Sequence, residues 1–131
     1  MIDYELNVFD KVYRQVSSLY ASGKFTSSYN PTPTAYPAGS LVELINRTDR
    51  KRQSSTPIEN YAIVMYQLDV YALSKKDTKA VYSATDDAMI SLGFTRVNGD
   101  FLDNADNVNV FRYTARYEAE IDRNGNIYRV T

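Results

Sequence analysis

The sequence predicts an α+β fold, in which a mostly antiparallel or mixed sheet of about five strands carries two α-helices on one face. Three observations lead to this prediction. Two segments place apolar residues at helical spacing, and two long segments alternate apolar with polar residues as half-buried strands do. The dipeptide Asn124-Gly125 near the end of the chain is typical of the tight turn of a β-hairpin.

The predicted helices are residues 3–20 and residues 77–92. The apolar stripe of the first consists of Leu6, Phe9, Val12, Val16 and Leu19. The stripe of the second consists of Val81, Ala84, Ala88 and Leu92. Ser74 or Asp77 is the expected N-cap of the second helix, and Gly93 is its expected C-cap. Because each helix has one apolar stripe, we expect both helices to cover the same face of a sheet.

Five segments are predicted to be strands: residues 41–47, 60–73, 94–98, 108–121 and 127–130. The second of these is the most strand-like part of the chain. Its even-numbered side chains, from Ala62 to Ala72, are all apolar and are expected to meet the helices. Its odd-numbered face turns polar at Gln67 and Asp69, so this face is expected to point away from the helices.

The strand predicted at residues 108–121 alternates just as cleanly. Its odd-numbered side chains, from Phe111 to Ile121, are expected to face the core. Its outward face carries mixed charge, from Arg112, Arg116, Glu118 and Glu120. These charges either pair across strands within one sheet or form an ion-pair ladder with another subunit. Gln67 and Asp69 allow the same two interpretations.

The connecting segments are a proline-rich loop at residues 24–40, a basic hairpin arm at residues 46–60 and an acidic link at residues 99–107. Three prolines keep the first loop out of regular helix. Its aromatic residues Phe25, Tyr29 and Tyr36 attach it either to the body of the chain or to a neighbour. No repeat and no boundary is visible, so residues 1–131 are predicted to form a single domain.

The composition narrows the classes of function. The chain has 131 residues, a net charge of −1, no cysteine and no histidine. These absences exclude disulfides and thiolate metal sites, and they remove the commonest general base. No apolar run approaches the roughly 20 residues of a membrane-spanning helix, and no secretion signal is recognisable, so we expect a soluble protein. The 12 tyrosines are typical either of an interface or of a thin core in a small domain.

No constellation of catalytic residues is recognisable in the sequence. The acidic link carries Asp100, Asp103 and Asp106, but their spacing does not match the alternating ligands of an EF-hand. Asp86 and Asp87 are neighbours in a predicted helix and therefore point apart. The five glycines form no phosphate-binding loop, and a serine or threonine nucleophile would lack histidine as its base. We therefore expect no enzymatic activity, no metal and no cofactor.

The basic hairpin arm reads NRTDRKRQSSTPIEN and carries Arg47, Arg50, Lys51 and Arg52. Three interpretations of these cations stay open. They bind phosphates of a nucleic acid, they belong to a solvated loop, or they present charge to another subunit. Four cations without a basic helix or interleaved aromatic residues are a weak signal for nucleic-acid binding.

Three pieces of the second half of the chain carry a resemblance to a known family. Glu59-Asn60-Tyr61 opens the long strand, LGFTR at residues 92–96 ends the second helix, and ARY at residues 115–117 leads through the hairpin turn to IYR at residues 127–129. In these features, and over residues 37–129, the chain resembles the tail-terminator (tail-completion) proteins of long-tailed bacteriophages and related tail-like particles. None of the three pieces is a catalytic motif.

The resemblance implies an α/β sandwich and a structural role in a virion. Members of the family form a hexameric ring on the head-proximal end of the tail tube, stop tube polymerisation and offer a surface to the head-completion proteins. The implied partners are further copies of the chain, the tail tube protein and a neck protein, with the sheath protein as an additional candidate. The implied location is the virion, after assembly in the host cytoplasm and without contact to a membrane.

In such a ring the basic arm is expected at a subunit, tube or lumen surface, where Arg50, Lys51 and Arg52 would make only transient, non-specific contact with passing DNA. The polar strand positions Gln67, Asp69, Arg112, Arg116, Glu118 and Glu120 would join Arg47 at such interfaces. Another neck-ring protein, either a head-closure (stopper) or a head-tail joining protein, is the alternative within the same class. A small nucleic-acid-binding module that uses the basic loop is the alternative outside it.

Overall fold

The structure is a computed structural model that describes residues 2–29, 33–48, 61–102 and 109–129. Its elements follow the chain as α1 (Glu5–Val16), the 3₁₀ turn η1 (Ser17–Leu19), β1 (Phe25–Thr26), β2 (Ala38–Thr48), β3 (Tyr61–Ala72), α2 (Lys75–Leu92), β4 (Thr95–Leu102), β5 (Phe111–Asp122) and β6 (Ile127–Tyr128). Every predicted helix and strand has a counterpart among these elements. The short strand β1 lies inside the segment predicted to be a proline-rich loop.

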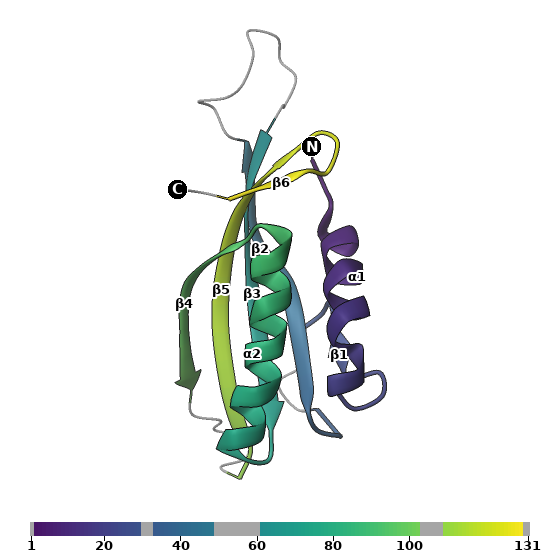
Figure 1. Cartoon of the computed structure of the whole chain (residues 1–131), viewed down its shortest axis with the longest axis vertical. Helices are drawn as coiled ribbons and strands as arrows, with labels where there is room; N and C mark the ends of the chain where they lie inside the picture. The colour runs from purple at the N-terminus through teal and green to yellow at the C-terminus, as the bar shows by residue number, and fades with distance from the viewer. Residues whose placement is uncertain (1, 30–32, 49–60, 103–108, 130–131) are drawn as a thin grey trace, which may run out of the picture.

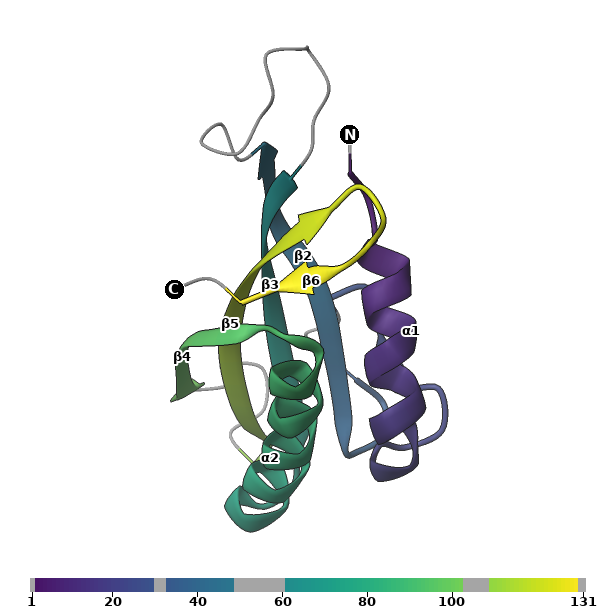
Figure 2. The same ribbon diagram turned by 45° about the horizontal axis from the view of Figure 1, so that its top comes forward.

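All six strands belong to one sheet, whose order is β1-β2-β3-β5-β4, with β6 paired to β5 (Figures 1 and 2). The pairs β2–β3, β3–β5, β4–β5 and β5–β6 are antiparallel, and β1 runs parallel to β2. The prediction of a mostly antiparallel, mixed sheet is therefore confirmed. The long strands β3 and β5 are neighbours at the centre and pair over their whole length.

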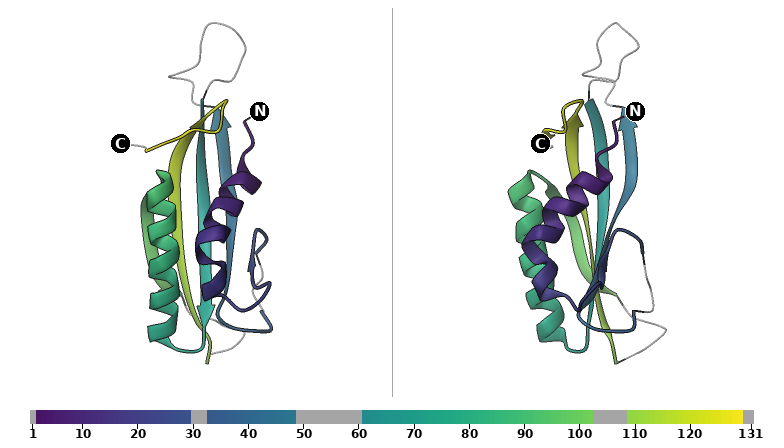
Figure 3. Two further views of the ribbon diagram at one scale, coloured as in Figure 1. Left: turned by 45° about the vertical axis from the view of Figure 1, so that its right-hand side comes forward. Right: turned by 90° about the vertical axis from the view of Figure 1, so that its right-hand side faces the viewer.

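Both helices lie on the same side of the sheet, as Figure 3 shows, and the predicted α+β class is confirmed. The even-numbered side chains of β3 from Ala62 to Ala72 are all buried, and Ala115, Tyr117 and Ala119 of β5 are buried beside them. This core consists of the helix-covered face of the sheet and the inward faces of the two helices. Strict alternation in the strands thus decided which face meets the helices.

The buried stripe of α1 differs from the prediction. Val8, Val12 and Val16 face the core, whereas Leu6 is 64% exposed and Leu19 is 40% exposed. Leu6 lies on the flank of the helix, away from the line of the three valines. Leu19 falls in the 3₁₀ turn, where the periodicity of the α-helix no longer applies.

The stripe of α2 is also rotated from the predicted one. Its buried residues are Thr78, Val81, Tyr82, Thr85, Ala88 and Met89. Two threonines are accepted inside because their hydroxyls donate to backbone carbonyls one turn earlier, over 2.7 Å from Thr78 and 2.9 Å from Thr85. Ser74 is the N-cap and accepts from the backbone N–H of Asp77 over 3.0 Å. Gly93 ends the helix at φ 111°, a conformation that favours glycine.

Two strand predictions need correction. The strand predicted at residues 94–98 is β4 and continues to Leu102, so the first part of the predicted acidic link is strand. Phe111 was expected in the core but is 39% exposed, because it is the first residue of β5 and lies at the end of the sheet opposite Ala72. Asp103 and Asp106 lie outside the described residues.

The proline-rich loop is attached to the body of the chain by its aromatic residues. Phe25 is buried and stacks on Phe9 of α1, with 5.3 Å between ring centroids. Tyr36 packs against a small apolar cluster formed by Ala38, Tyr71 and Val110. The loop therefore covers one end of the sheet from within the same chain.

The basic hairpin arm connects two strands that pair up to its base. The last described pair of the β2–β3 hairpin is Thr48 with Ala62. Arg47 lies in β2, whereas Arg50, Lys51 and Arg52 lie outside the described residues. The prediction of a hairpin between these two strands is confirmed.

Candidate functional site

The face of the sheet that the helices leave uncovered gathers the polar residues that the sequence singled out. Cross-strand pairs join Gln67 with Arg116 and Tyr71 with Arg112. Because side chains alternate along a strand, this open face carries all seven predicted interface residues that the structure describes. They are Arg47, Gln67, Asp69, Arg112, Arg116, Glu118 and Glu120.

A buried ion pair lies at one end of the open face. The carboxylate Oδ1 of Asp69 lies 2.9 Å from the Arg112 Nη2 and accepts from the Arg112 Nε over 3.0 Å. The Gln67 amide donates to the other oxygen, Oδ2, over 2.9 Å. The side chain of Asp69 is 2% exposed, although no helix covers it. The pair therefore ties β3 to β5 within the chain, which is the cross-strand pairing that the sequence allowed for Asp69 and Arg112.

Two tyrosines complete the enclosure of this ion pair. The guanidinium carbon of Arg112 lies 5.5 Å from the ring centroid of Tyr29 and 5.8 Å from that of Tyr71. Burial opposes the charge of Arg112, but the hydrogen bond and the charge of Asp69 outweigh burial and raise the pKa of Arg112. Burial also raises the pKa of the Tyr71 hydroxyl, which donates to Tyr29 over 3.4 Å. The proline-rich loop thus reaches the open face through Tyr29.

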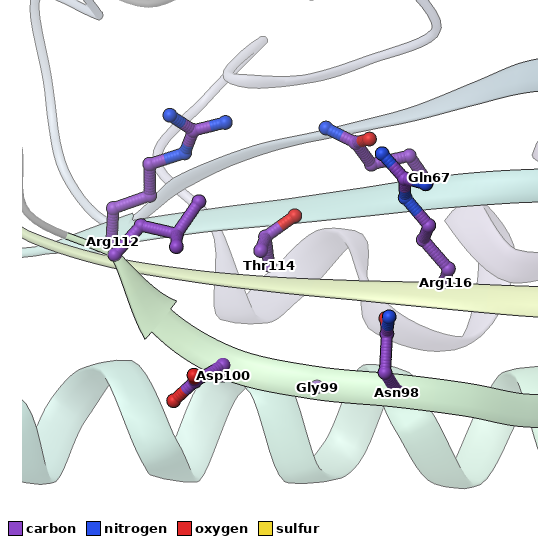
Figure 4. A pocket seen from close by; sticks show the side chains of 8 residues that line it. Gln67, Asn98, Gly99, Asp100, Arg112, Thr114 and Arg116 are labelled. Atoms are coloured by element: carbon purple, nitrogen blue, oxygen red, sulfur yellow. The ribbon is translucent and has the colours of Figure 1, made fainter.

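A polar hollow of about 580 Å³ lies beside the ion pair and runs over β3, β5 and β4 (Figure 4). Its lining residues are Gln67, Asn98, Gly99, Asp100, Leu102, Arg112, Thr114 and Arg116. In Figure 4 the amide of Gln67 and the guanidinium of Arg116 lie close to each other over neighbouring strands. Guanidinium and amide groups donate hydrogen bonds, so this part of the hollow presents donors that acidic or carbonyl groups could accept.

The described part of the proline-rich loop does not contact the other end of the open face. Ile45 on β2 is 45% exposed, and Ile63 and Met65 on β3 are half-buried next to it. Glu118 and Glu120 face these residues from β5, and Arg47 is exposed at the arm end of β2. Exposed apolar groups framed by charges are typical of a protein interface.

A second polar network lies under α2 and accounts for Asp86. The Tyr117 hydroxyl donates to Asp86 Oδ1 over 2.6 Å, and the Tyr82 hydroxyl donates to the same oxygen over 3.2 Å. Arg96 on β4 forms an ion pair with Asp86 over 3.2 Å. Asp87 is exposed on the helix surface. The Asp86-Asp87 pair is therefore split between a structural network and solvent, as the helical spacing predicted.

The irregular geometry of the outer strands β2 and β4 was not predicted from the sequence. β2 and β4 each contain a β-bulge, between Glu43 and Ile45 and between Arg96 and Asn98. Bulges aim side chains of edge strands in new directions. Glu43 and Arg96 stand at these bulges, and neither bulge has a signal in the sequence pattern.

The described residues contain no group of three or more acidic side chains placed to hold a metal ion. Neither helix in the described part of the chain is long and apolar enough to cross a membrane. What this part of the chain does present is an extended surface with charged, apolar and hydrogen-bonding groups.

The fold is similar to that of a chain in the virion of a native gene transfer agent particle. The TM-score is 0.62, and the match covers 87% of this chain and 93% of that chain. The sequences are 14% identical, so the likeness concerns the fold. Neither a protein-family model nor a curated protein matches the sequence.

Proposed function

We propose that this chain is a structural subunit of a phage-like virion, and that within the virion it is the tail terminator. In this role it forms a hexameric ring that caps the head-proximal end of the tail tube, stops tube polymerisation and offers the neck its attachment surface. The observation that carries the proposal is the fold shared with a virion chain of the gene transfer agent particle over nearly the full length of both chains. The sequence resemblance over residues 37–129 adds the more specific assignment.

The distribution of polar groups supports a structural role. The two buried polar networks are satisfied within the chain and hold the fold together, the first through Asp69 and Arg112 and the second through Asp86 and Tyr117. A subunit that must keep its shape while several partners bind needs such internal ties. The open face then remains available for contact with other proteins.

The shape of the sheet supports assembly into a closed ring. A ring requires a head-to-tail interface, in which two different surfaces of each subunit meet. The two borders of this sheet differ, because α1 flanks β2 on one side and α2 flanks β4 on the other (Figure 3). In the proposed ring the basic arm lies at a subunit, tube or lumen surface, and its cations make only transient contact with DNA.

Electron microscopy of the particle that contains this chain tests the assignment. We expect sixfold density for the chain at the junction of tube and neck, in direct contact with the last ring of tube protein. A position between this ring and the head would identify a head-closure protein instead. Density elsewhere in the particle, or no association with a particle, would refute the proposal.

A DNA-binding assay tests the role of the basic arm. Changing Arg50, Lys51 and Arg52 together to alanine is expected to leave DNA binding weak and unspecific, as in the parent chain. Tight binding by the parent chain that the triple variant loses, with a steep dependence on salt, would favour the nucleic-acid-binding module.

A further inference from the structure

We propose that neighbouring copies of this chain join edge to edge, with β2 of one copy pairing antiparallel to β4 of the next and Arg96 meeting the acidic border at Glu43. The inference rests on the proposed ring and specifies the interface that closes it. It places the partner, a second copy of the chain, on two strand borders that have no strand beside them in the described structure.

Both borders of the sheet offer unused pairing positions. On β2, residues 41–47 pair with β3 on one side, and β1 covers only Gly39 and Ser40 on the other. On β4, residues 96–102 pair with β5, and no further strand of the described chain follows. Such borders attract another strand unless something blocks them. The two borders are of similar length.

The directions of the two borders suit a ring. Three successive antiparallel pairs separate β2 from β4, so these strands run in opposite directions. A rotation about an axis along the strands changes neither the direction nor the height of a strand. The β4 of one copy would therefore meet the β2 of the next copy antiparallel and at the same level, which is a head-to-tail contact.

The register places opposite charges at one level. Arg96 pairs with Tyr117, Tyr117 pairs with Tyr66, and Tyr66 pairs with Glu43. Arg96 and Glu43 thus lie at the two ends of one row across the sheet. Both side chains belong to the helix-covered side, since Arg96 forms an ion pair with Asp86 of α2 and Glu43 is paired with Tyr66, which is buried on that side. Joining two copies without a shift brings the two ends of the row together.

Among the described residues, no cation forms an ion pair with Glu43 at this border. The backbone N–H of Glu43 donates to the Glu5 carboxylate over 2.8 Å, so α1 occupies this one position of the border and the backbone of the next copy would pair on either side of it. One carboxylate oxygen of Glu43, Oε1, is enclosed and has no hydrogen-bond partner among the described residues. Burial raises the pKa of Glu43, and the negative charges of Glu5 and Asp3 raise it further against a hydrogen bond from Asn46. A guanidinium at this border would neutralise the crowded carboxylates, once the Glu43 side chain turns outward.

Arg96 can contact Glu43 of the next copy while it keeps its ion pair with Asp86. Its side chain is 49% exposed, and its Nη1 serves both Asp86 over 3.2 Å and the Tyr82 hydroxyl over 3.4 Å. A guanidinium carries five N–H donors, so others remain for a carboxylate of the next copy. Arg96 is thus held in place by its own subunit while it points at the border.

Apolar side chains flank the same level on both borders. The bulge residue Leu44 follows Glu43 and is 44% exposed, and the bulge residue Val97 follows Arg96 and is 50% exposed. In the antiparallel arrangement these two side chains lie on either side of the charged pair. In this register Val97 would lie opposite Val42 of the next copy, and their contact would remove apolar surface from both subunits.

Disulfide trapping tests the pairing directly, because the natural chain has no cysteine. Paired strands bring opposing Cα atoms to about 5 Å, within the range of about 4.4–6.8 Å that a disulfide requires. The full-length variant carrying both Val42→Cys and Val97→Cys, which lie opposite each other when Arg96 meets Glu43, is expected to give a ladder of covalent oligomers on oxidation. Each single variant is expected to give dimers at most. The matched control combines Val42→Cys with Leu73→Cys, whose site is 62% exposed but lies beyond the end of β3.

The charge is tested separately by Glu43→Gln, which keeps the shape of the side chain. We expect it to weaken self-association in sedimentation by at least about tenfold, whereas Asp87→Asn on the exposed side of α2 leaves self-association unchanged. Equal ladders from the test pair and the control pair, or no ladder at high protein concentration, would overturn the edge pairing. A sixfold ring in the particle together with either of these results would leave the proposed function standing and refute only this interface.

Discussion

The two faces of β3 reach burial by different means. On the face under the helices, apolar side chains such as Val64 and Leu68 are buried by packing alone. On the open face, Asp69 is 1% exposed and Tyr71 is 2% exposed, although only strands and a loop surround them. The difference teaches that this small sheet has two cores, one apolar and one built around an ion pair.

The open face itself is divided along its length. The ion-pair end is closed by Tyr29 and Tyr36 of the proline-rich loop. The arm end, with Ile45 and Met65, has no comparable cover among the described residues. We infer that the closed end serves the stability of the subunit, and that the arm end serves its contacts. Substitutions at the two ends of the open face distinguish these two roles.

The largest effect is expected from Arg112→Ala, which leaves the carboxylate of Asp69 buried and uncompensated. Breaking a buried ion pair in this way typically costs about 3–5 kcal/mol, because the remaining charge has lost its partner. Urea denaturation of the purified chain measures the loss. The control is Arg116→Ala, four residues along the same strand and face but exposed, for which we expect a change within about 0.5 kcal/mol.

The interpretation also requires that the carboxylate causes the loss. Adding Asp69→Asn to Arg112→Ala is expected to recover part of the stability, because the amide needs no counter-charge. Equal losses for Arg112→Ala and Arg116→Ala would contradict the division between a closed end and an open end.

A smaller effect is expected from two tyrosines that lie side by side in the apolar core. The Tyr117 hydroxyl donates to the Asp86 carboxylate, whereas the Tyr66 hydroxyl is buried and has no hydrogen-bond partner among the described residues. Tyr117→Phe is expected to cost about 1.5–3 kcal/mol, the range for a hydrogen bond to a charged group. Tyr66→Phe is expected to be neutral or stabilising. Thermal and urea unfolding of both variants provide the measurement, and a similar cost for both would show that the Tyr66 hydroxyl has a partner.

The pH dependence of stability is expected to separate two carboxylates. Burial, aided by Glu5 and Asp3 and opposed by Asn46, raises the pKa of Glu43 above its ordinary value of 4.5. The folded chain therefore holds this proton more tightly than the unfolded chain does. The contribution to stability is complete below pH 4.5 and is lost as the pH rises through the raised pKa. Glu43→Gln is expected to flatten the unfolding free energy in that window.

Asp122 in the last hairpin is expected to behave in the opposite way. Burial is the largest single influence and raises its pKa, but the hydrogen bonds from Asn126, Tyr128 and Asn124 together outweigh burial, so the pKa lies below the ordinary value of 3.8. Its contribution to stability is present above pH 3.8 and is lost as the pH falls through the lowered pKa. Unfolding measured from acidic to neutral pH for Asp122→Asn checks the sign. We expect that variant to lose stability at neutral pH and little at acidic pH, and a loss that grows as the pH falls would contradict the assignment.

The burial of the apolar face of the sheet, which the helices cover, is predictable from the sequence. Alternation alone placed the six even-numbered side chains of β3 in the core, because a strand period of two leaves no choice once one face is buried. Helix faces were harder to predict, since Thr78 and Thr85 pack inward through hydrogen bonds that no hydropathy pattern reveals. Leu6, which helical spacing predicts to be buried in the core, is instead exposed in the folded chain.

The candidate site was predictable only in part. The sequence pointed to the polar positions on the open face, but it did not pair Asp69 with Arg112, because their separation of 43 residues is bridged only by the fold. The role of Tyr29 depends on the path of a loop, and the row from Glu43 to Arg96 depends on two bulges. Such features arise from strand register, which local patterns do not encode.

The smallest effect on stability is expected at the arm end of the open face. Ile45→Thr removes apolar surface from a side chain that is already 45% exposed, and threonine keeps the β-branched shape that a strand favours. We therefore expect the free energy of unfolding to change by no more than about 0.5 kcal/mol. Leu68→Ala, on the helix-covered face, is the contrasting variant and is expected to cost about 2–5 kcal/mol. If Ile45→Thr instead destabilised the isolated chain as strongly as Leu68→Ala, the arm end would belong to the folding core. If it left stability unchanged but reduced incorporation into the virion to which we propose this chain belongs, the arm end would be a contact surface.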